Sequence, residues 1–123
     1  MKFSWRCFSL ETAAIAKKII DAALNKQASD ILLLDLREVC SFADYFVICN
    51  GESERQIQAI CDEINQTLSK EGISASHYEG SADSGWVLLD LGDIIVHIFN
   101  PQQREFYGLE KVWSKASPVV KIL

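Results

Sequence analysis

WVLLDLGDIIVHIF (residues 86–99) contains two apolar runs separated by a turn at Gly92, a pattern that predicts a β-hairpin. Asp90 and Asp93 flank the glycine, and His97 lies within the second run. Two carboxylates and an imidazole so close together are compatible with a catalytic site. They are equally compatible with the polar tip of an apolar hairpin that binds another protein, so the rest of the chain must distinguish these two hypotheses.

The segments before the hairpin predict one helix and two buried strands. Residues 9–27 place small and aliphatic side chains at helical spacing. DILLLDL (30–36) and DYFVICN (44–50) are apolar at nearly every position. Continuous runs of this length are typical of strands that are buried on both faces of a sheet covered by helices.

A second helix and an edge strand are predicted next. Ser53 and Gln56 have the spacing of a capping box, in which each side chain satisfies a free backbone N–H group at the start of a helix. Gly72 is expected to end this helix in the left-handed conformation. ISASHYEG (73–80) has the pattern of a weak strand near an edge of the sheet.

Short helical turns are predicted after the hairpin, in NPQQREFYGLEKVW (100–113), where Asn100 and Pro101 suit the N-cap and first helical positions. The predicted order is helix, two strands, helix, three strands, helix. This order predicts an α/β (α+β) fold in which helices pack on a mixed five-stranded sheet.

Length and charge limit the possible functions. The chain has 123 residues, which is typical of one domain, and 17 acidic against 12 basic side chains give a formal net charge of −5. Nucleic-acid affinity depends largely on Lys and Arg, so direct nucleic-acid binding is disfavoured. An acidic surface instead steers a protein toward a basic protein partner.

The cysteines and the N-terminus indicate a reducing, cytoplasmic location. No Cys-x-x-Cys pair occurs, and no histidine lies near a cysteine at zinc-binding spacing, so neither a disulfide framework nor a metal site is expected. The first residues lack a sustained signal-peptide core, and no apolar run is long enough to span a membrane. The four cysteines are Cys7, Cys40, Cys49 and Cys61.

NGESERQ (50–56) is a candidate phosphate site, because a strand runs through glycine into a capped helix there. A nucleotide-transfer enzyme would also need two carboxylates on one strand face to hold magnesium. Asp35 has no second carboxylate in phase, and Asp90 and Asp93 are separated by a turn. Ser53 is therefore interpreted as a helix cap, and no cofactor is expected.

The remaining polar side chains are interpreted as structural. His97 has the strand parity of its apolar neighbours, so we expect a core or interface histidine, packed beneath the Gly92 turn, and no catalytic triad. His77 is expected to be solvated. Arg104 and Glu105 are expected to form a solvated surface pair.

Two interpretations of Trp86 are open. It shares one face of its strand with Leu88 and Asp90, and it either completes the core or remains exposed as an aromatic anchor with an acidic rim. The aromatic residues after the hairpin either extend such a patch or anchor the last helix; they are Phe106, Tyr107 and Trp113.

Several motifs together resemble the ribosomal silencing factor family, also called RsfS or Iojap. The resemblance covers residues 9–123 as a single domain and leaves residues 1–8 as a flexible N-terminal extension. The matching motifs are DILLLDLREVCSFADYFVICNGESERQIQAI (30–60), Glu79-Gly80, GWVLLDLGDIIVHIF (85–99) and REFYGLEKVW (104–113).

The resemblance implies a binding factor and no enzyme activity. Family members have a nucleotidyltransferase-like fold without the metal-binding carboxylate pair. They bind large-subunit ribosomal protein fourteen, block association with the small ribosomal subunit, and thereby repress translation when nutrients are scarce. Members in organelles are linked to large-subunit assembly, and members form homodimers when free.

The resemblance also implies a set of partner-binding residues, in which acidic side chains complement a basic ribosomal protein and Trp86 is the anchor. Two alternatives remain open at this stage. One is a nucleotidyltransferase that uses the Gly51–Ser53 turn, and the other is a dimeric adaptor whose hairpin face is its own dimer interface. The implied residues are Glu79, Trp86, Asp90, Leu91, Asp93 and Tyr107.

Overall fold

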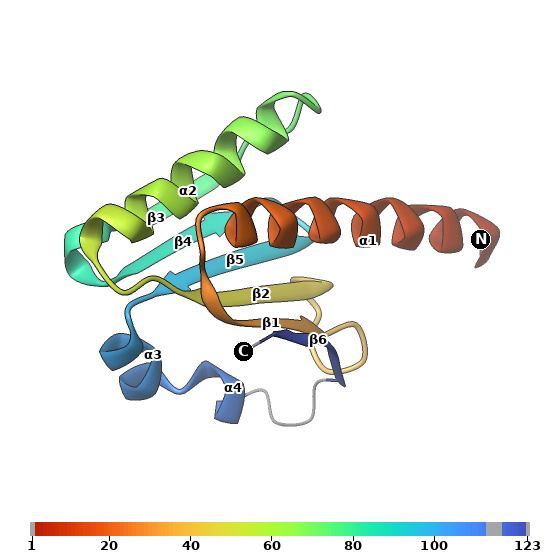
Figure 1. Ribbon diagram of the computed structural model, residues 1–123. Helices are drawn as coiled ribbons and strands as arrows, with labels where there is room; N and C mark the ends of the chain where they lie inside the picture. The colour runs from red at the N-terminus through yellow and green to blue at the C-terminus, as the bar shows by residue number, and fades with distance from the viewer. Residues whose placement is uncertain (1, 113–116, 123) are drawn as a thin grey trace.

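The computed structural model describes residues 2–112 and 117–122, which form one six-stranded sheet with helices on both faces (Figure 1). The strand order in the sheet is β3-β4-β5-β2-β1-β6. Within the described residues no helix is long and apolar enough to cross a membrane. In chain order the elements are α1 (Lys2–Asn25), β1 (Ser29–Asp35), β2 (Tyr45–Asn50), α2 (Glu54–Ser69), β3 (His77–Ser81), the 3₁₀ turn η1 (Ala82–Ser84), β4 (Trp86–Asp90), β5 (Ile94–Phe99), α3 (Pro101–Tyr107), α4 (Leu109–Val112) and β6 (Ser117–Ile122).

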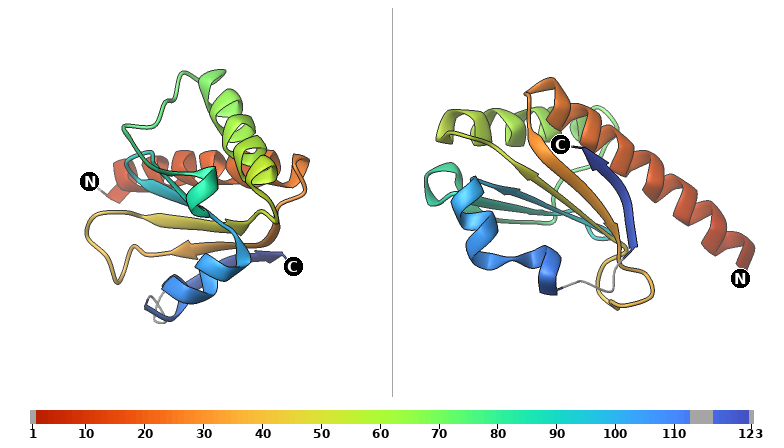
Figure 2. Two further views of the ribbon diagram at one scale, coloured as in Figure 1. Left: turned by 90° about the vertical axis from the view of Figure 1, so that its left-hand side faces the viewer. Right: turned by 60° about the horizontal axis from the view of Figure 1, so that its bottom comes forward.

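The centre of the sheet is the parallel pair β2 and β5, and every other pairing is antiparallel, so the predicted mixed sheet is confirmed. Every residue of β2 and β5 is buried. Strands of this kind need cover on both faces. The long helices α1 and α2 lie together on one face, and the short helices α3 and α4 lie on the other (Figures 1 and 2).

The prediction of five strands is wrong, because β6 adds a sixth at the outer edge beside β1. Its sequence, SPVVKI, is short and contains Pro118, which lacks the N–H group that a central strand needs. An edge strand such as β6 tolerates this residue, and the pairing with β1 shifts register beside it. Two boundaries also differ: α1 begins at Lys2, and the edge strand predicted at 73–80 forms only from His77 onward.

One of the two hydrogen bonds predicted for the capping box of α2 is present. The Ser53 side chain accepts a hydrogen bond from the Gln56 backbone N–H over 3.1 Å. The reciprocal bond differs, because Gln56 Oε1 accepts from the backbone of Glu52 over 2.7 Å. The Gln56 amide nitrogen also donates to the carbonyls of Lys26 and Gln27, so this side chain ties the end of α1 to the start of α2.

A cluster of apolar and aromatic side chains fills the sheet face opposite α1 and α2, and His97 lies inside it. The Trp86 indole N–H donates to His97 Nδ1 over 3.1 Å, and the Phe46 ring lies 4.7 Å from the imidazole centroid to centroid. The prediction that His97 packs beneath the Gly92 turn is wrong. His97 pairs with Leu88, in the middle of the hairpin, because the extended strand carries it away from the turn.

Gly80 in β3 has a left-handed backbone with φ of +81°, and a Cβ atom there would lie 2.1 Å from the carbonyl oxygen of Trp86. That oxygen belongs to the backbone of β4, so it cannot move without disturbing the β3–β4 pairing. Gly72 has a similar φ of +75°, but a Cβ atom there meets nothing within 4 Å. Substitutions at both glycines would impose a left-handed backbone on a residue with a Cβ atom, but only a substitution at Gly80 would also cause a steric clash.

We expect Gly80→Ala to lower the free energy of unfolding by at least twice as much as Gly72→Ala. A left-handed alanine costs about 1 to 2 kcal/mol at either site, and only position 80 adds the clash with β4. Urea unfolding of both variants measures the difference. Equal losses would contradict a close backbone approach at Gly80.

Burial lowers the pKa of His97 to about 4. An indole N–H only donates, so Nδ1 must accept and the neutral ring carries its proton on Nε2. That atom is buried and has no partner among the residues that the structure describes. Since the pKa of an unfolded histidine is near 6.5, the unfolded chain gains a proton between pH 6.5 and 4 that the folded chain does not gain.

As the pH falls from 7 to 4, we therefore expect His97 to remove about 3 kcal/mol from the free energy of unfolding. Urea unfolding at a series of pH values measures the loss, with His97→Gln as the test variant and the exposed His77→Gln as its control. The pH dependence should become shallower in His97→Gln alone. An unchanged pH dependence in His97→Gln would show that His97 is not the group responsible.

Candidate protein-binding face

Strand β4 presents alternate side chains to the two faces of the sheet, as its sequence predicts. Val87 and Leu89 are fully buried beneath α1 and α2. Trp86, Leu88 and Asp90 are half-exposed on the opposite face. This second face is where α3 and α4 pack, and their cover is incomplete over β4.

A hollow of about 280 Å³ opens at this incomplete cover, and we call it the Trp86 hollow. The Trp86 ring stacks on buried Phe99, with 5.1 Å between ring centroids, and contacts Tyr107 of α3 at 4.4 Å. Trp86 therefore packs against the core and also lines the hollow, and its role as an anchor for a partner stays a prediction. The lining residues are Glu79, Gly80, Ser84, Trp86, Leu88, Gln103 and Tyr107.

The Trp86 hollow is lined by one carboxylate, and an exposed aromatic ring lies beside Tyr107 of its wall. Glu79 is exposed and lies directly opposite Leu88 in the β3–β4 ladder. Its carboxylate is 2.9 Å from the imidazole of His77, which is exposed as predicted. Phe106 is 77% exposed and meets Tyr107 edge to face. An apolar depression with an acidic rim is typical of a protein-binding hot spot.

The structure brings together Glu79, Trp86 and Tyr107 of the expected partner-binding residues. Asp90 lies on the same face at the other end of β4, where its Oδ1 accepts from the backbone N–H of Gly92 over 2.9 Å. This bond matches the alternative that Asp90 holds the turn. Trp113, the third aromatic residue considered after the hairpin, lies outside the described residues.

Leu91 and Asp93 lie at the turn, apart from the Trp86 hollow. Leu91 packs against the core beneath α1 and α2. The backbone carbonyl of Asp93 accepts from Asp44 and Tyr45, which connects the hairpin turn to the start of β2. Burial and the neighbouring Asp44 carboxylate raise the pKa of the Asp93 carboxyl.

Gln103 and Ser84 line the hollow but were not predicted. Gln103 and Tyr107 are four residues apart on α3, so helical spacing places them on one side of that helix. The sequence could therefore have indicated Gln103 once Tyr107 had been chosen as a partner-binding residue. Ser84 belongs to the η1 turn, whose position depends on the left-handed Gly85 that follows it, and no periodicity in the sequence indicates it.

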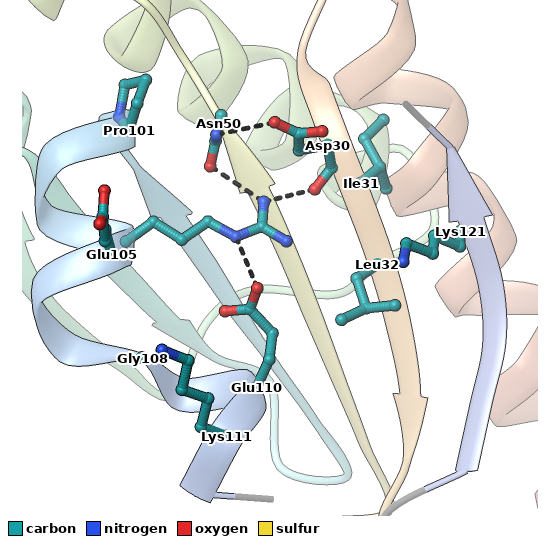
Figure 3. Close-up of a pocket in the computed structure, with 11 residues that line it drawn as sticks. Asp30, Ile31, Leu32, Asn50, Pro101, Glu105, Gly108, Glu110, Lys111 and Lys121 are labelled. Atoms are coloured by element: carbon teal, nitrogen blue, oxygen red, sulfur yellow. Dashed lines mark hydrogen bonds and ion pairs between the residues drawn. The ribbon is translucent and has the colours of Figure 1, made fainter. Parts of the chain in front are cut away.

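The prediction that Arg104 and Glu105 form a solvated pair is wrong for Arg104. Only 12% of the Arg104 side chain is exposed, because its guanidinium lies against the start of β1 and the end of β2. Its Nε donates to Glu110 over 3.2 Å, and its Nη1 donates to Asn50 Oδ1 over 2.9 Å and to the carbonyl of Asp30 (Figure 3). Glu105 remains exposed.

The Gly51–Ser53 turn is occupied by contacts within the chain. The Gly51 N–H donates to the carbonyl of Phe99 over 2.8 Å, and the Glu52 N–H donates to Gln56. Ser53 Oγ accepts from the Gln56 backbone. These bonds use the N–H groups of Gly51, Glu52 and Gln56, and they agree with the interpretation of Ser53 as a helix cap.

Asp35 is held by Arg37, with 2.6 Å between Oδ2 and Nη2, and this hydrogen bond lowers the pKa of the Asp35 carboxyl. Within residues 2–112 and 117–122, no group of three or more His, Cys, Asp and Glu side chains is arranged to hold a metal ion. Cys49 and Cys61 are buried, and burial raises the pKa of the Cys49 thiol to about 12.

Comparisons with known proteins agree with the resemblance. The family model described as "Ribosomal silencing factor during starvation" matches residues 9–122. The Ribosomal silencing factor RsfS of Bacillus subtilis is 44% identical over 103 residues, which are 84% of this chain and 87% of that protein. The mouse protein "Mitochondrial assembly of ribosomal large subunit protein 1" is 28% identical over 80% of this chain and 45% of its own length. A crystal structure of a protein from Chromobacterium violaceum superposes with a TM-score of 0.79 at 31% identity, covering 88% of this chain and 92% of that one. The chain therefore belongs to the ribosomal silencing factor family.

Proposed function

We propose that this protein binds the large ribosomal subunit through a basic ribosomal protein, large-subunit protein fourteen, and prevents association with the small subunit. It thereby represses translation in the cytoplasm without catalysing a reaction. Family membership supports this proposal. The name of the mouse relative also connects a similar chain with the large ribosomal subunit.

The observation that carries the proposal is the Trp86 hollow with Glu79 on its rim. Trp86, Leu88 and Tyr107 offer apolar surface that becomes desolvated when a partner side chain enters. Glu79 supplies negative charge beside this surface, in a chain whose formal net charge is −5. A basic partner with a protruding apolar side chain complements both features.

The proposed contact continues along β4 to the hairpin turn. Asp90 shares the open face with Trp86, and four residues of strand separate the two by roughly 13 Å. Leu91 and Asp93 lie just beyond Asp90. We therefore place the anchor of the interface at the Trp86 hollow and its acidic periphery at the turn.

The mechanism is steric. A bound domain occupies the surface that the small subunit must approach, so repression depends on the fraction of large subunits that carry the protein. Affinity and protein concentration determine that fraction. The free protein is proposed to be a homodimer, and its dimer interface need not coincide with the Trp86 hollow.

Subunit association tests the function, and Glu79→Lys tests the site. We expect wild-type protein to sediment with purified large subunits and to reduce formation of whole ribosomes in a sucrose gradient. Reversing the charge of the exposed Glu79 should weaken binding roughly tenfold, because a basic partner then meets a like charge. Trp86→Ala is less suitable, since it also removes the hydrogen-bond donor to buried His97.

The matched control is Asp21→Lys, which makes the same charge change on α1, across the sheet from the hollow. This variant should bind like the wild type. If the wild type sediments with neither subunit, the proposed function fails. If it binds but both variants bind equally well, the function stands and the site is misplaced.

Salt dependence tests the acidic periphery. We expect the affinity for the large subunit to fall as ionic strength rises from 0.05 to about 0.5 M, because the Debye length contracts from roughly 14 to 4 Å and screens exposed charges. The slope should be smaller in Glu79→Lys than in the wild type. An affinity that does not change with salt would mean that the acidic residues take no part in binding.

A further inference from the structure

Helix α3 separates two depressions of the second sheet face. Gln103 and Tyr107, four residues apart, line the Trp86 hollow. The opposite side of the same helix lines a larger pocket, which we call the Arg104 pocket. The residues that α3 and its C-cap contribute to this pocket recur at helical spacing, and they are Pro101, Arg104, Glu105 and Gly108.

The Arg104 pocket has a volume of about 580 Å³, within the usual range for small-molecule sites. The start of β1, the end of β2, one side of α3, and α4 and β6 surround it (Figure 3). Leu32 and Pro101 give its wall an apolar part. A pocket of this size accepts a small organic molecule rather than a bare ion.

The pocket gathers three of the twelve basic side chains of an acidic chain: Arg104, Lys111 and Lys121. Lys121 pairs directly with Leu32 in the β1–β6 ladder, so it projects from the face that carries the pocket. Neither lysine forms a hydrogen bond or ion pair with any residue that the structure describes.

Three carboxylates also line the pocket, and two of them accept hydrogen bonds from other side chains of the pocket wall. Asp30 Oδ2 accepts from the side-chain amide of Asn50 over 3.3 Å, and Glu110 accepts from Arg104 Nε. Glu105 is exposed at the rim. Asp30 and Glu110 thus hold the wall together.

The Arg104 guanidinium is held in a position from which it can bind an anion. Its Nε and Nη1 atoms are fixed by bonds to Glu110, Asn50 and the carbonyl of Asp30. Its Nη2 atom has no partner among the described residues. A guanidinium that is already immobilised loses little further conformational freedom when its remaining N–H groups bind a ligand.

We propose that the Arg104 pocket binds a small organic anion, a carboxylate or phosphate group attached to an apolar or ring-shaped body. The anionic group lies among Arg104 Nη2, Lys111 and Lys121, and the body lies against Leu32 and Pro101. This inference is independent of the proposed ribosome binding, because it concerns the other side of α3.

Backbone-amide NMR of the full-length protein tests the pocket with three probes: AMP, octanoate and inorganic phosphate. We expect saturable shifts in residues 30–32, 104–105 and 110–111 with AMP or octanoate. Tighter binding of AMP identifies a phosphate ligand, and tighter binding of octanoate identifies a carboxylate. Inorganic phosphate should bind much more weakly than the better organic probe, because it lacks the apolar body.

The test variant is Lys111→Gln/Lys121→Gln, in which binding should weaken about tenfold. Both lysines are exposed, so the variant should retain the wild-type spectrum outside the pocket. Lys17→Gln/Lys70→Gln removes two exposed charges elsewhere and should bind like the wild type. The proposal is overturned if neither organic probe gives saturable shifts, if inorganic phosphate binds as tightly as the better organic probe, or if the two double variants bind equally.

Discussion

The complete burial of β2 and β5 is the constraint on which the rest of the structure depends. Every side chain of this parallel pair is enclosed, so both faces of the sheet must be covered by other elements. On one face the helices are long, with 24 residues in α1 and 16 in α2. On the other face they are short, with seven residues in α3 and four in α4. The sheet is thus well covered on one side and sparsely covered on the other.

The candidate binding face follows from this difference in cover. Short helices reach across the central strands but not across β4 and β3, and every residue of β3 is exposed. Aromatic side chains fill part of the gap, because Trp86 stacks on buried Phe99 and contacts Tyr107. What they leave open is the Trp86 hollow. A rigid aromatic wall loses little conformational entropy when a partner binds, which favours its use as an interface.

Local patterns in the sequence predicted the hairpin, the Asn100–Pro101 helix start and the alternation of β4, because each depends on neighbouring residues alone. The sixth strand, the orientation of Gln56 and the burial of Arg104 were not predicted. Each depends on segments that are distant in the sequence: β6 needs β1, Gln56 bonds to the end of α1, and Arg104 bonds to the starts of β1 and α4 and to the end of β2. The alternation of side chains along β4 predicted that Trp86 and Leu88 share one face of the sheet. That Leu91 and Asp93 lie apart from the hollow is visible only in the tertiary structure.

The polar groups of the hairpin form hydrogen bonds that support its own folding. Asp90 accepts from Gly92 at the turn, whereas His97 lies in the middle of the sheet with its Nδ1 bonded to Trp86. Burial lowers the pKa of His97 to about 4, so the imidazole is a poor proton acceptor near neutral pH. Asp93 lies at the turn, and its backbone carbonyl holds the start of β2. These side chains do not converge on a common point, and the bond between His97 and Trp86 instead fixes the aromatic ring that lines the candidate interface.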